Sequence, residues 1–165
     1  PECSVYAFEA NVDAGVIYQE HSVSNYHLGV LTDCDHRTVT FWNNPENTTG
    51  NSYYRENTPA YEHSSAQIRS GLTLDTVVSQ RSWPLPDLMK IDVQGSELDV
   101  LQGASKCLSQ CRDLFVECQL SEYNLGAPGA QQVIDYLSQL GFGLVGEIDK
   151  TRVDIDYHFS RDSTP

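Results

Sequence analysis

The stretch LMKIDVQGSELDVLQGA at residues 88–104 limits the fold of this chain more than any other segment. Its apolar start predicts a buried strand that ends at Asp92, and Gly95 permits a tight turn directly afterwards. Apolar residues then recur at helical spacing after Ser96, which predicts a helix. A strand, a turn and a helix in this order are typical of open α/β sheets, which bind ligands at the carboxyl ends of their strands. We therefore expect the Asp92 carboxylate to face a ligand site.

Strand and helix patterns alternate through the rest of the chain. Helices are expected after Asn11 as an N-cap, around 74–78, after Ser96 and at 130–140. Strands are expected at residues 4–9, 26–32, 37–42, 67–71, 88–92, 114–118, 142–148 and 154–159, the last two forming an antiparallel hairpin. The 165 residues are therefore expected to form one α/β domain, residues 1–165, as a three-layer sandwich with a mostly parallel sheet.

Charge and cysteine usage exclude several functional classes. The net charge of −13 is unfavourable for phosphate-rich partners, so we expect neither nucleic acid nor a membrane surface as a partner. No apolar run approaches the ~20 residues of a membrane-spanning helix. The 5 cysteines form no regular framework, which favours reduced thiols and a cytoplasmic protein. Cys107 and Cys111 have the spacing of a helical metal pair, but no further ligand completes a site, so we predict buried apolar residues.

Three carboxylates near strand ends and one loop histidine are candidates for chemistry. Glu9 ends an apolar strand, where an acid either accepts hydrogen bonds from the ribose of a nucleotide cofactor or acts as an ordinary cap. Burying Asp92 is costly unless it is paired or faces a solvated cleft. Glu117 ends the next strand and is expected to share that cleft, so the two could act as base and orienting group or bind a divalent cation. His63, in the long polar loop at 43–65, is a further candidate base, although a solvated loop histidine is commoner.

Four segments together resemble the FkbM-type methyltransferase family. They are VYAFEAN at 5–11, NTTGNSYY at 47–54, LTLDTVV at 72–78 and the segment at 88–104, and FVEC at 115–118 is consistent with the family's next strand. The resemblance implies an S-adenosylmethionine-dependent O-methyltransferase with the Rossmann-like fold of class I methyltransferases. Its acceptor would be a hydroxyl on a sugar, a glycan or a small metabolite.

The resemblance also implies roles for the cofactor-binding residues. Glu9 would bind the ribose, together with Asn11 of the same motif, and Asp33 would lie near the adenine. Asp92 would lie at the methionine end of the cofactor, beside the transferring methyl group. The sequence departs from the family at Gln94, where glutamate is common, and at two positions flanking Asn11, Ala10 and Val12, where prolines are common.

On the acceptor side, the loop at 43–65 would overhang the pocket. Asp92 or Glu117, with help from His63, would assist removal of the hydroxyl proton. The sequence indicates no metal ligand set, so a divalent metal is conceivable only through the carboxylate pair.

In this family a first strand and a glycine-rich cofactor loop precede the acid that Glu9 represents. Neither is found before Glu9, and two strand edges would be left open without that strand. We therefore expect an N-terminally truncated domain, or another segment that fills the gap, and weak cofactor binding if the chain stands alone. Two alternatives stay open: an NAD-dependent oxidoreductase, because Glu9 suits an NAD ribose equally well, and a non-catalytic binding module with a truncated methyltransferase fold.

Overall fold

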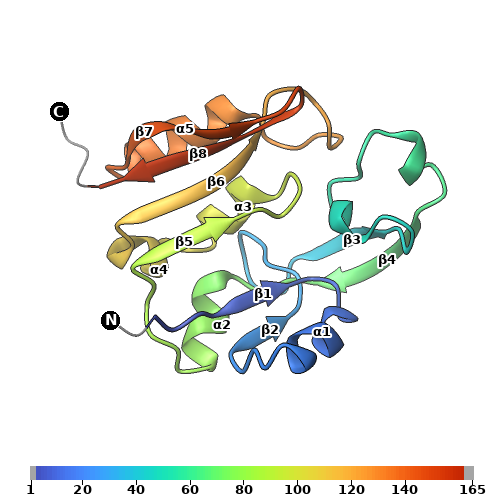
Figure 1. The fold of residues 1–165 in the computed structure, drawn as a ribbon, viewed down its shortest axis with the longest axis horizontal. Coiled ribbons are helices and arrows are strands. Elements are labelled where there is room, and N and C mark those ends of the chain that lie inside the picture. The colour runs from blue at the N-terminus through green and yellow to red at the C-terminus, as the bar shows by residue number, and fades with distance from the viewer. Residues whose placement is uncertain (1–2, 162–165) are drawn as a thin grey trace.

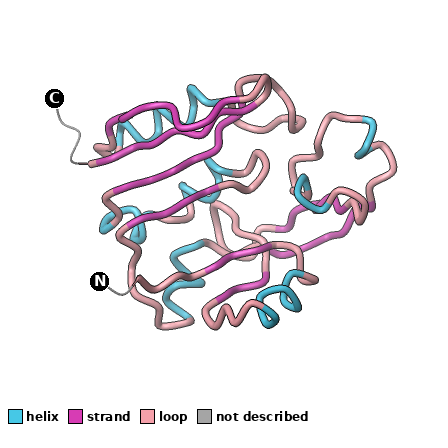
Figure 2. Tube along the Cα trace, viewed as in Figure 1, coloured by secondary structure: helices cyan, strands magenta, loops and turns pink. Residues whose placement is uncertain are grey.

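The computed structural model describes residues 3–161 and confirms the α/β class (Figure 1). Its α-helices are α1 (Ala14–Glu20), α2 (Leu74–Gln80), α3 (Glu97–Gln102), α4 (Ser105–Gln110) and α5 (Ala130–Gln139). Its strands are β1 (Ala7–Glu9), β2 (Tyr26–Leu28), β3 (Thr38–Asn43), β4 (Ser65–Ser70), β5 (Leu88–Ile91), β6 (Asp113–Gln119), β7 (Gly143–Lys150) and β8 (Asp154–Ser160). Figure 2 shows how loops of very different length join these elements.

The largest sheet has the strand order β5-β6-β8-β7. β5 and β6 are parallel, whereas β8 is antiparallel to both β6 and β7, which confirms the predicted terminal hairpin. Alternate residues of β6, Leu114, Val116 and Cys118, are buried in one cluster with Leu101 of α3 and Val133 of α5. The residues between them are partly exposed, so the helices cover one face of this sheet.

The strands are less parallel, and less continuous, than the sequence predicts. The hairpin places β8 antiparallel between β6 and β7, and β3 and β4 also pair antiparallel. Among the strands of residues 3–161, parallel pairing is therefore limited to β1–β2 and β5–β6. Within residues 3–161, β1 and β5 each have one hydrogen-bonded strand neighbour. Aromatic side chains, and not strand pairing, join the β1 segment to the segment before β5. The rings of Tyr6 and Phe8 lie 5.0 and 5.6 Å from that of Trp83, which precedes β5.

Two helices differ from the expected ones. The apolar pattern after Ser96 predicts one helix, but α3 and α4 are separate elements with Gly103 between them. Gly103 packs so tightly that a Cβ atom there would lie 2.3 Å from the carbonyl oxygen of Thr32. The N-cap of α1 is Asp13 and not Asn11, whose side-chain oxygen instead accepts a hydrogen bond from the Asp13 N–H at 3.1 Å.

The polar loop at 43–65 is an ordered part of the fold. It contains two short 3₁₀ helices, η1 (Thr48–Gly50) and η2 (Pro59–Tyr61). Asn124, in the loop after β6, donates a hydrogen bond to the carbonyl oxygen of Tyr54 at 2.6 Å, and an isolated bridge pairs Asn124 with Glu56. These contacts attach the polar loop to the end of β6.

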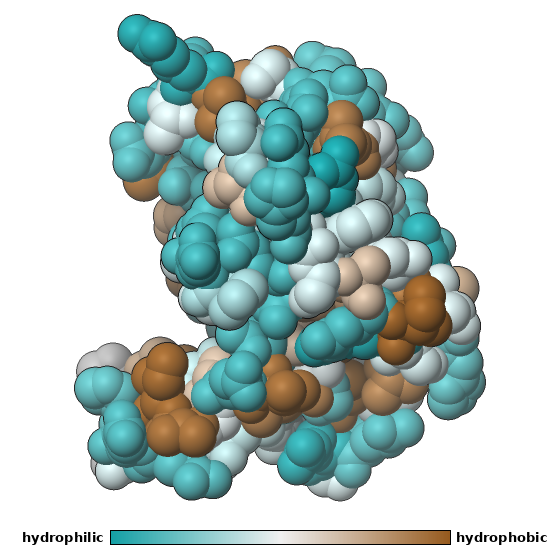
Figure 3. Space-filling model, turned by 90° about the vertical axis from the view of Figure 1, so that its right-hand side faces the viewer, coloured by the Kyte–Doolittle hydropathy of each residue, from teal (hydrophilic) through white to brown (hydrophobic). Residues whose placement is uncertain are grey.

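Apolar side chains lie both inside and on the surface. Cys107 and Cys111 are completely buried, as the sequence predicts. Figure 3 shows one side of the molecule, where hydrophobic surface gathers in the lower part and the upper part is mostly hydrophilic. Val12, Val16 and Ile17, in and next to α1, are among the exposed large apolar residues. Within the described residues, no helix is long and apolar enough to cross a membrane.

Candidate functional site

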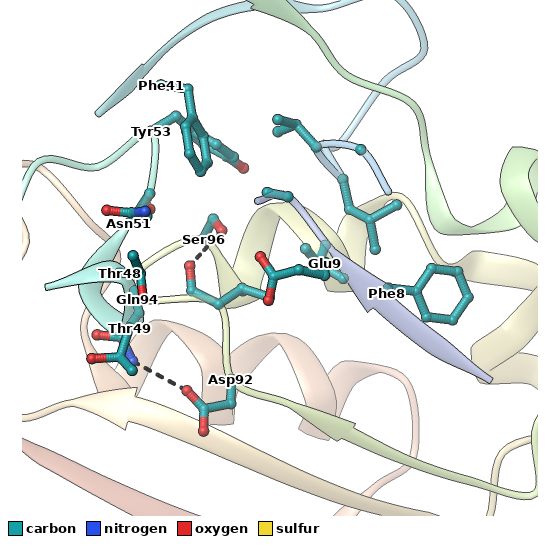
Figure 4. A pocket seen from close by; sticks show the side chains of 17 residues that line it. Phe8, Glu9, Phe41, Thr48, Thr49, Asn51, Tyr53, Asp92, Gln94 and Ser96 are labelled. Atoms are coloured by element: carbon teal, nitrogen blue, oxygen red, sulfur yellow. Dashed lines mark hydrogen bonds between the residues drawn. The ribbon is translucent and has the colours of Figure 1, made fainter. Parts of the chain in front are cut away.

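A pocket of about 120 Å³ lies where β1 and β5 end, and residues of the polar loop form one of its walls (Figure 4). Glu9 and Asp92, which are 83 positions apart in the sequence, both line it. Among the described residues of the lining, they are the only charged side chains. The loop contributes hydroxyl and amide groups from Thr48, Thr49 and Asn51. The pocket therefore presents two carboxylates among uncharged polar and apolar groups.

The turn after β5 has an unusual backbone that is held by a buried carboxylate. Gln94 and Gly95 have φ angles of 57° and 96°, in the left-handed region that few residues adopt. The buried side chain of Glu97 accepts hydrogen bonds from the N–H groups of Val93 and Gly95 at 3.1 and 3.0 Å. Burial raises the pKa of Glu97 to about 7, although these hydrogen bonds act in the opposite direction. Glu97 is therefore the anchor of the turn that presents Asp92.

Asp92 and Glu117 lie side by side on the neighbouring strands. The Gln94 amide donates a hydrogen bond to one oxygen of each, at 3.1 Å to Asp92 and 3.0 Å to Glu117. Lys90 Nζ lies 3.1 Å from the other oxygen of Asp92. Partial burial and then the negative charge of Asp92 raise the pKa of Glu117 to about 8. Glu117 therefore keeps its proton to a higher pH than an ordinary glutamate does, beside the hydrogen-bonded Asp92.

Comparison with known proteins identifies the family. The model of the methyltransferase FkbM domain matches residues 1–144, which is most of the chain. The chain belongs to the FkbM methyltransferase family. No curated protein and no solved structure gave a match. The family resemblance that the sequence segments carry is thus confirmed, and the pocket is that of a methyltransferase domain.

On the Glu9 side of this FkbM pocket, one carboxylate oxygen is held by the main chain and the other is available as an acceptor within the described residues. Glu9 accepts a hydrogen bond from the Asn11 N–H on Oε1 at 2.6 Å, whereas its Oε2 has no hydrogen bond within residues 3–161. This oxygen can accept a hydrogen bond from a ribose hydroxyl. Arg69 of β4 donates to the Ala10 carbonyl oxygen and thereby fixes the turn that follows Glu9. Asn11 supports Glu9 through its main chain, and its side chain does not line the pocket.

Asp33, His63 and Glu117 are not among the residues that line the pocket. Asp33 lies in the turn after β2. Partial burial opposes its ionisation, but the hydrogen bond from Arg37 at 2.7 Å, the charge of Arg37 and weaker local hydrogen bonds together outweigh burial and lower the pKa of Asp33. His63 is exposed just after η2. Glu117 reaches the pocket only indirectly, because Gln94 bridges it to Asp92. The adenine role of Asp33 and the proton-transfer role of His63 stay predictions.

The FkbM domain also contains pocket residues that sequence reasoning did not single out. Thr48, Thr49, Asn51 and Tyr53 all belong to the NTTGNSYY segment, which was informative only as a family motif. Which of its side chains face the pocket depends on the path of the loop, and local sequence does not determine that path. Across residues 3–161, no group of three or more His, Cys, Asp or Glu side chains could hold a metal ion, so a divalent cation between Asp92 and Glu117 gains no support.

Proposed function

We propose that this domain transfers the methyl group of S-adenosylmethionine to a hydroxyl oxygen of a sugar, a glycan or a small metabolite. The observation that carries the proposal is the joint position of Glu9 and Asp92 in one pocket of an FkbM domain. β1, β2 and β5, which belong to the parallel pairs β1–β2 and β5–β6, end at this pocket, which supports a Rossmann-like fold.

The residues of the pocket divide the work between binding and proton transfer. When bound, S-adenosylmethionine supplies a methyl group on a sulfonium leaving group. Glu9 binds the ribose through Oε2, which is the free oxygen of its carboxylate. Asp92, held by Lys90 and Gln94, accepts the proton of the acceptor hydroxyl. Glu117 is protonated below about pH 8, so it is better suited to orient Asp92 than to act as the base.

The loop wall supports a hydroxylated acceptor. Thr48, Thr49 and Asn51 offer hydroxyl and amide groups that can both donate and accept hydrogen bonds. Such groups match the alternating donors and acceptors of a sugar, and they place no positive charge in the described lining to attract a phosphate.

Calorimetric titration with S-adenosylmethionine and with NAD tests the cofactor. We expect S-adenosylmethionine to bind, weakly if the chain stands alone, and NAD not to bind. Glu9→Gln should weaken binding roughly 10- to 100-fold, because a charged hydrogen bond to the ribose is lost. Asp13→Asn is the matched control, since Asp13 is exposed and makes no side-chain cap. Binding of NAD alone would identify an oxidoreductase, and binding of neither would identify a non-catalytic module.

Methyl transfer itself is tested with methyl-labelled S-adenosylmethionine and a panel of neutral monosaccharides. Asp92→Ala should lower the transfer rate by about 10²-fold or more, because the group that receives the hydroxyl proton is removed. If Asp92→Ala transfers methyl groups as fast as the parent and binds the cofactor equally well, Asp92 has no role in the reaction.

A further inference from the structure

Asp99 of α3 is the point where three side chains from distant parts of the chain meet. Its Oδ2 atom accepts hydrogen bonds from the hydroxyl groups of Tyr53 and Tyr54 at 2.9 and 3.1 Å. Arg37 Nη1 donates to the same oxygen at 3.0 Å and also binds Asp33 at 2.7 Å. Asp99 is only 7% exposed. One buried carboxylate therefore joins α3, the polar loop and the turn after β2.

This cluster lies directly behind the pocket. Tyr53 and Val100, the residue after Asp99, both line the pocket. The Tyr53 and Tyr54 rings pack together at a centroid distance of 5.0 Å, and the Arg37 guanidinium lies 5.7 Å from the Tyr53 ring centre. Because Asn51 and Ser52 precede Tyr53 and also line the pocket, the position of Tyr53 determines where this wall stands.

The protonation states of the cluster make Tyr53, Tyr54 and Arg37 the donors and Asp99 the acceptor of its hydrogen bonds. Burial, and then the negative charge of Asp99, raise the pKa of both Tyr53 and Tyr54 above the usual range. Both phenols therefore stay protonated and act as donors. The hydrogen bond of Asp33 and the charge of Asp99 raise the pKa of Arg37, which stays cationic. Without the Asp99 carboxylate, three partly buried donors lose their common acceptor.

We propose that Asp99 is a positioning residue: through Tyr53 and Tyr54 it holds the segment at 47–54 against α3 and so preforms the loop wall of the pocket that Glu9 and Asp92 also line. The inference rests on the proposed function, since its effect on binding assumes that this pocket takes S-adenosylmethionine. A preformed wall lowers the entropic cost of binding, because the loop is already ordered before the ligand arrives.

Asp99→Asn tests this role, because the amide keeps the shape of the side chain but removes the negative charge that Arg37 and both phenols face, which leaves one neutral carbonyl oxygen for three donors. We expect binding of S-adenosylmethionine, measured by calorimetry, to weaken at least tenfold. Hydrogen exchange of the amides at 47–54 should accelerate at least tenfold. Tyr53→Phe removes only one of the three hydrogen bonds and should produce a smaller change in the same direction.

Asp75→Asn is the matched control for a purely structural effect. Asp75 accepts hydrogen bonds from the N–H groups of Lys106 and Cys107 at 2.7 and 2.9 Å, and it does not line the pocket. This variant should lower thermal stability without changing affinity or exchange at 47–54. Exchange at 47–54 that is as slow in Asp99→Asn as in the parent protein would overturn the proposal.

The two proposals fail in different ways. If the parent protein does not bind S-adenosylmethionine, the proposed function fails, whereas hydrogen exchange at 47–54 still decides the role of Asp99. Unchanged exchange in Asp99→Asn then shows that Asp99 does not hold the loop. Faster exchange shows that it does.

Discussion

Gly95, in the turn between β5 and α3 that carries the pocket residues Gln94 and Ser96, is the position whose substitution has the most predictable outcome. Its φ of 96° lies outside the range that an L-residue adopts easily, which costs roughly 1–2 kcal/mol for alanine. A Cβ atom on Gly95 would also lie 2.9 Å from the Cβ atoms of Ala127 and Asn124 and from Nε2 of Gln119. Relieving this crowding costs a further ~1–3 kcal/mol, since the atoms belong to a packed interior.

Alanine also stiffens the unfolded chain, which offsets about 0.4–1 kcal/mol of these costs. We therefore expect Gly95→Ala to lower the free energy of unfolding by about 2–4 kcal/mol. For a domain of this size, the melting temperature should fall by roughly 5–15 °C. Urea unfolding followed by circular dichroism measures the free energy, and calorimetry measures the melting temperature. Binding of S-adenosylmethionine should weaken as well, because the turn presents Asp92 to the pocket.

Gly126→Ala separates crowding from backbone strain. Gly126 has a φ of 75°, but nothing lies within 4 Å of the position that its Cβ would occupy. It carries the strain and the unfolded-state effect without the clash, so it should cost about 1 kcal/mol or less. If Gly95→Ala is no more destabilising than Gly126→Ala, the close packing around Gly95 does not contribute, and the reasoning is refuted.

Two further predictions concern stability. The folded protein keeps the proton of Glu117 up to about pH 8, whereas an unfolded glutamate loses it near 4.5, so this group makes stability fall as the pH rises between these values. Glu117→Gln should remove this loss of stability, which amounts to about 1–2 kcal/mol after allowing for solvent screening of a partly exposed group. Urea unfolding at pH 5 and 8.5 measures the change in the free energy of unfolding between the two pH values. The same change in both proteins would contradict the prediction. Arg161 donates hydrogen bonds to the carbonyl oxygens of Cys111, Leu140 and Leu108 at 3.2, 2.8 and 3.0 Å and lies 4.2 Å from the Phe142 ring centre. Arg161→Ala should cost about 2–4 kcal/mol in thermal or urea unfolding, against little change for the exposed Arg152→Ala, and equal stability of the two variants would show that these contacts add nothing.

The sequence predicts the elements of the fold better than their assembly. Short-range patterns are sufficient for α2, α5 and the β7–β8 hairpin, because each depends on neighbouring residues. The break between α3 and α4 depends instead on Thr32, a residue 71 positions before Gly103. Pairing of strands is also a long-range property, and this is why the predicted mostly parallel sheet differs from the separate sheets of the structure.

The same distinction applies to the pocket. Glu9 and Asp92 could be predicted because a carboxylate at the end of an apolar strand is unusual in itself. Tyr53 and Asp99 could not, because neither residue is unusual where it stands, and 46 positions separate the partners of their hydrogen bond. His63 is a different case: its residue type suggests chemistry, the loop carries it to an exposed position after η2, and its role stays a prediction.

Gln94 shows why one departure from the family pattern is compatible with the chemistry. The family commonly has glutamate at this position, whereas the amide of Gln94 donates to both Asp92 and Glu117. A glutamate there would add a third carboxyl group to the pair and would need a proton of its own to make either hydrogen bond. The amide makes both bonds at any pH, so the position of Asp92 does not depend on a further protonation. Glutamine therefore keeps Asp92 in place, and Glu117 is the group of this cluster whose pKa is raised.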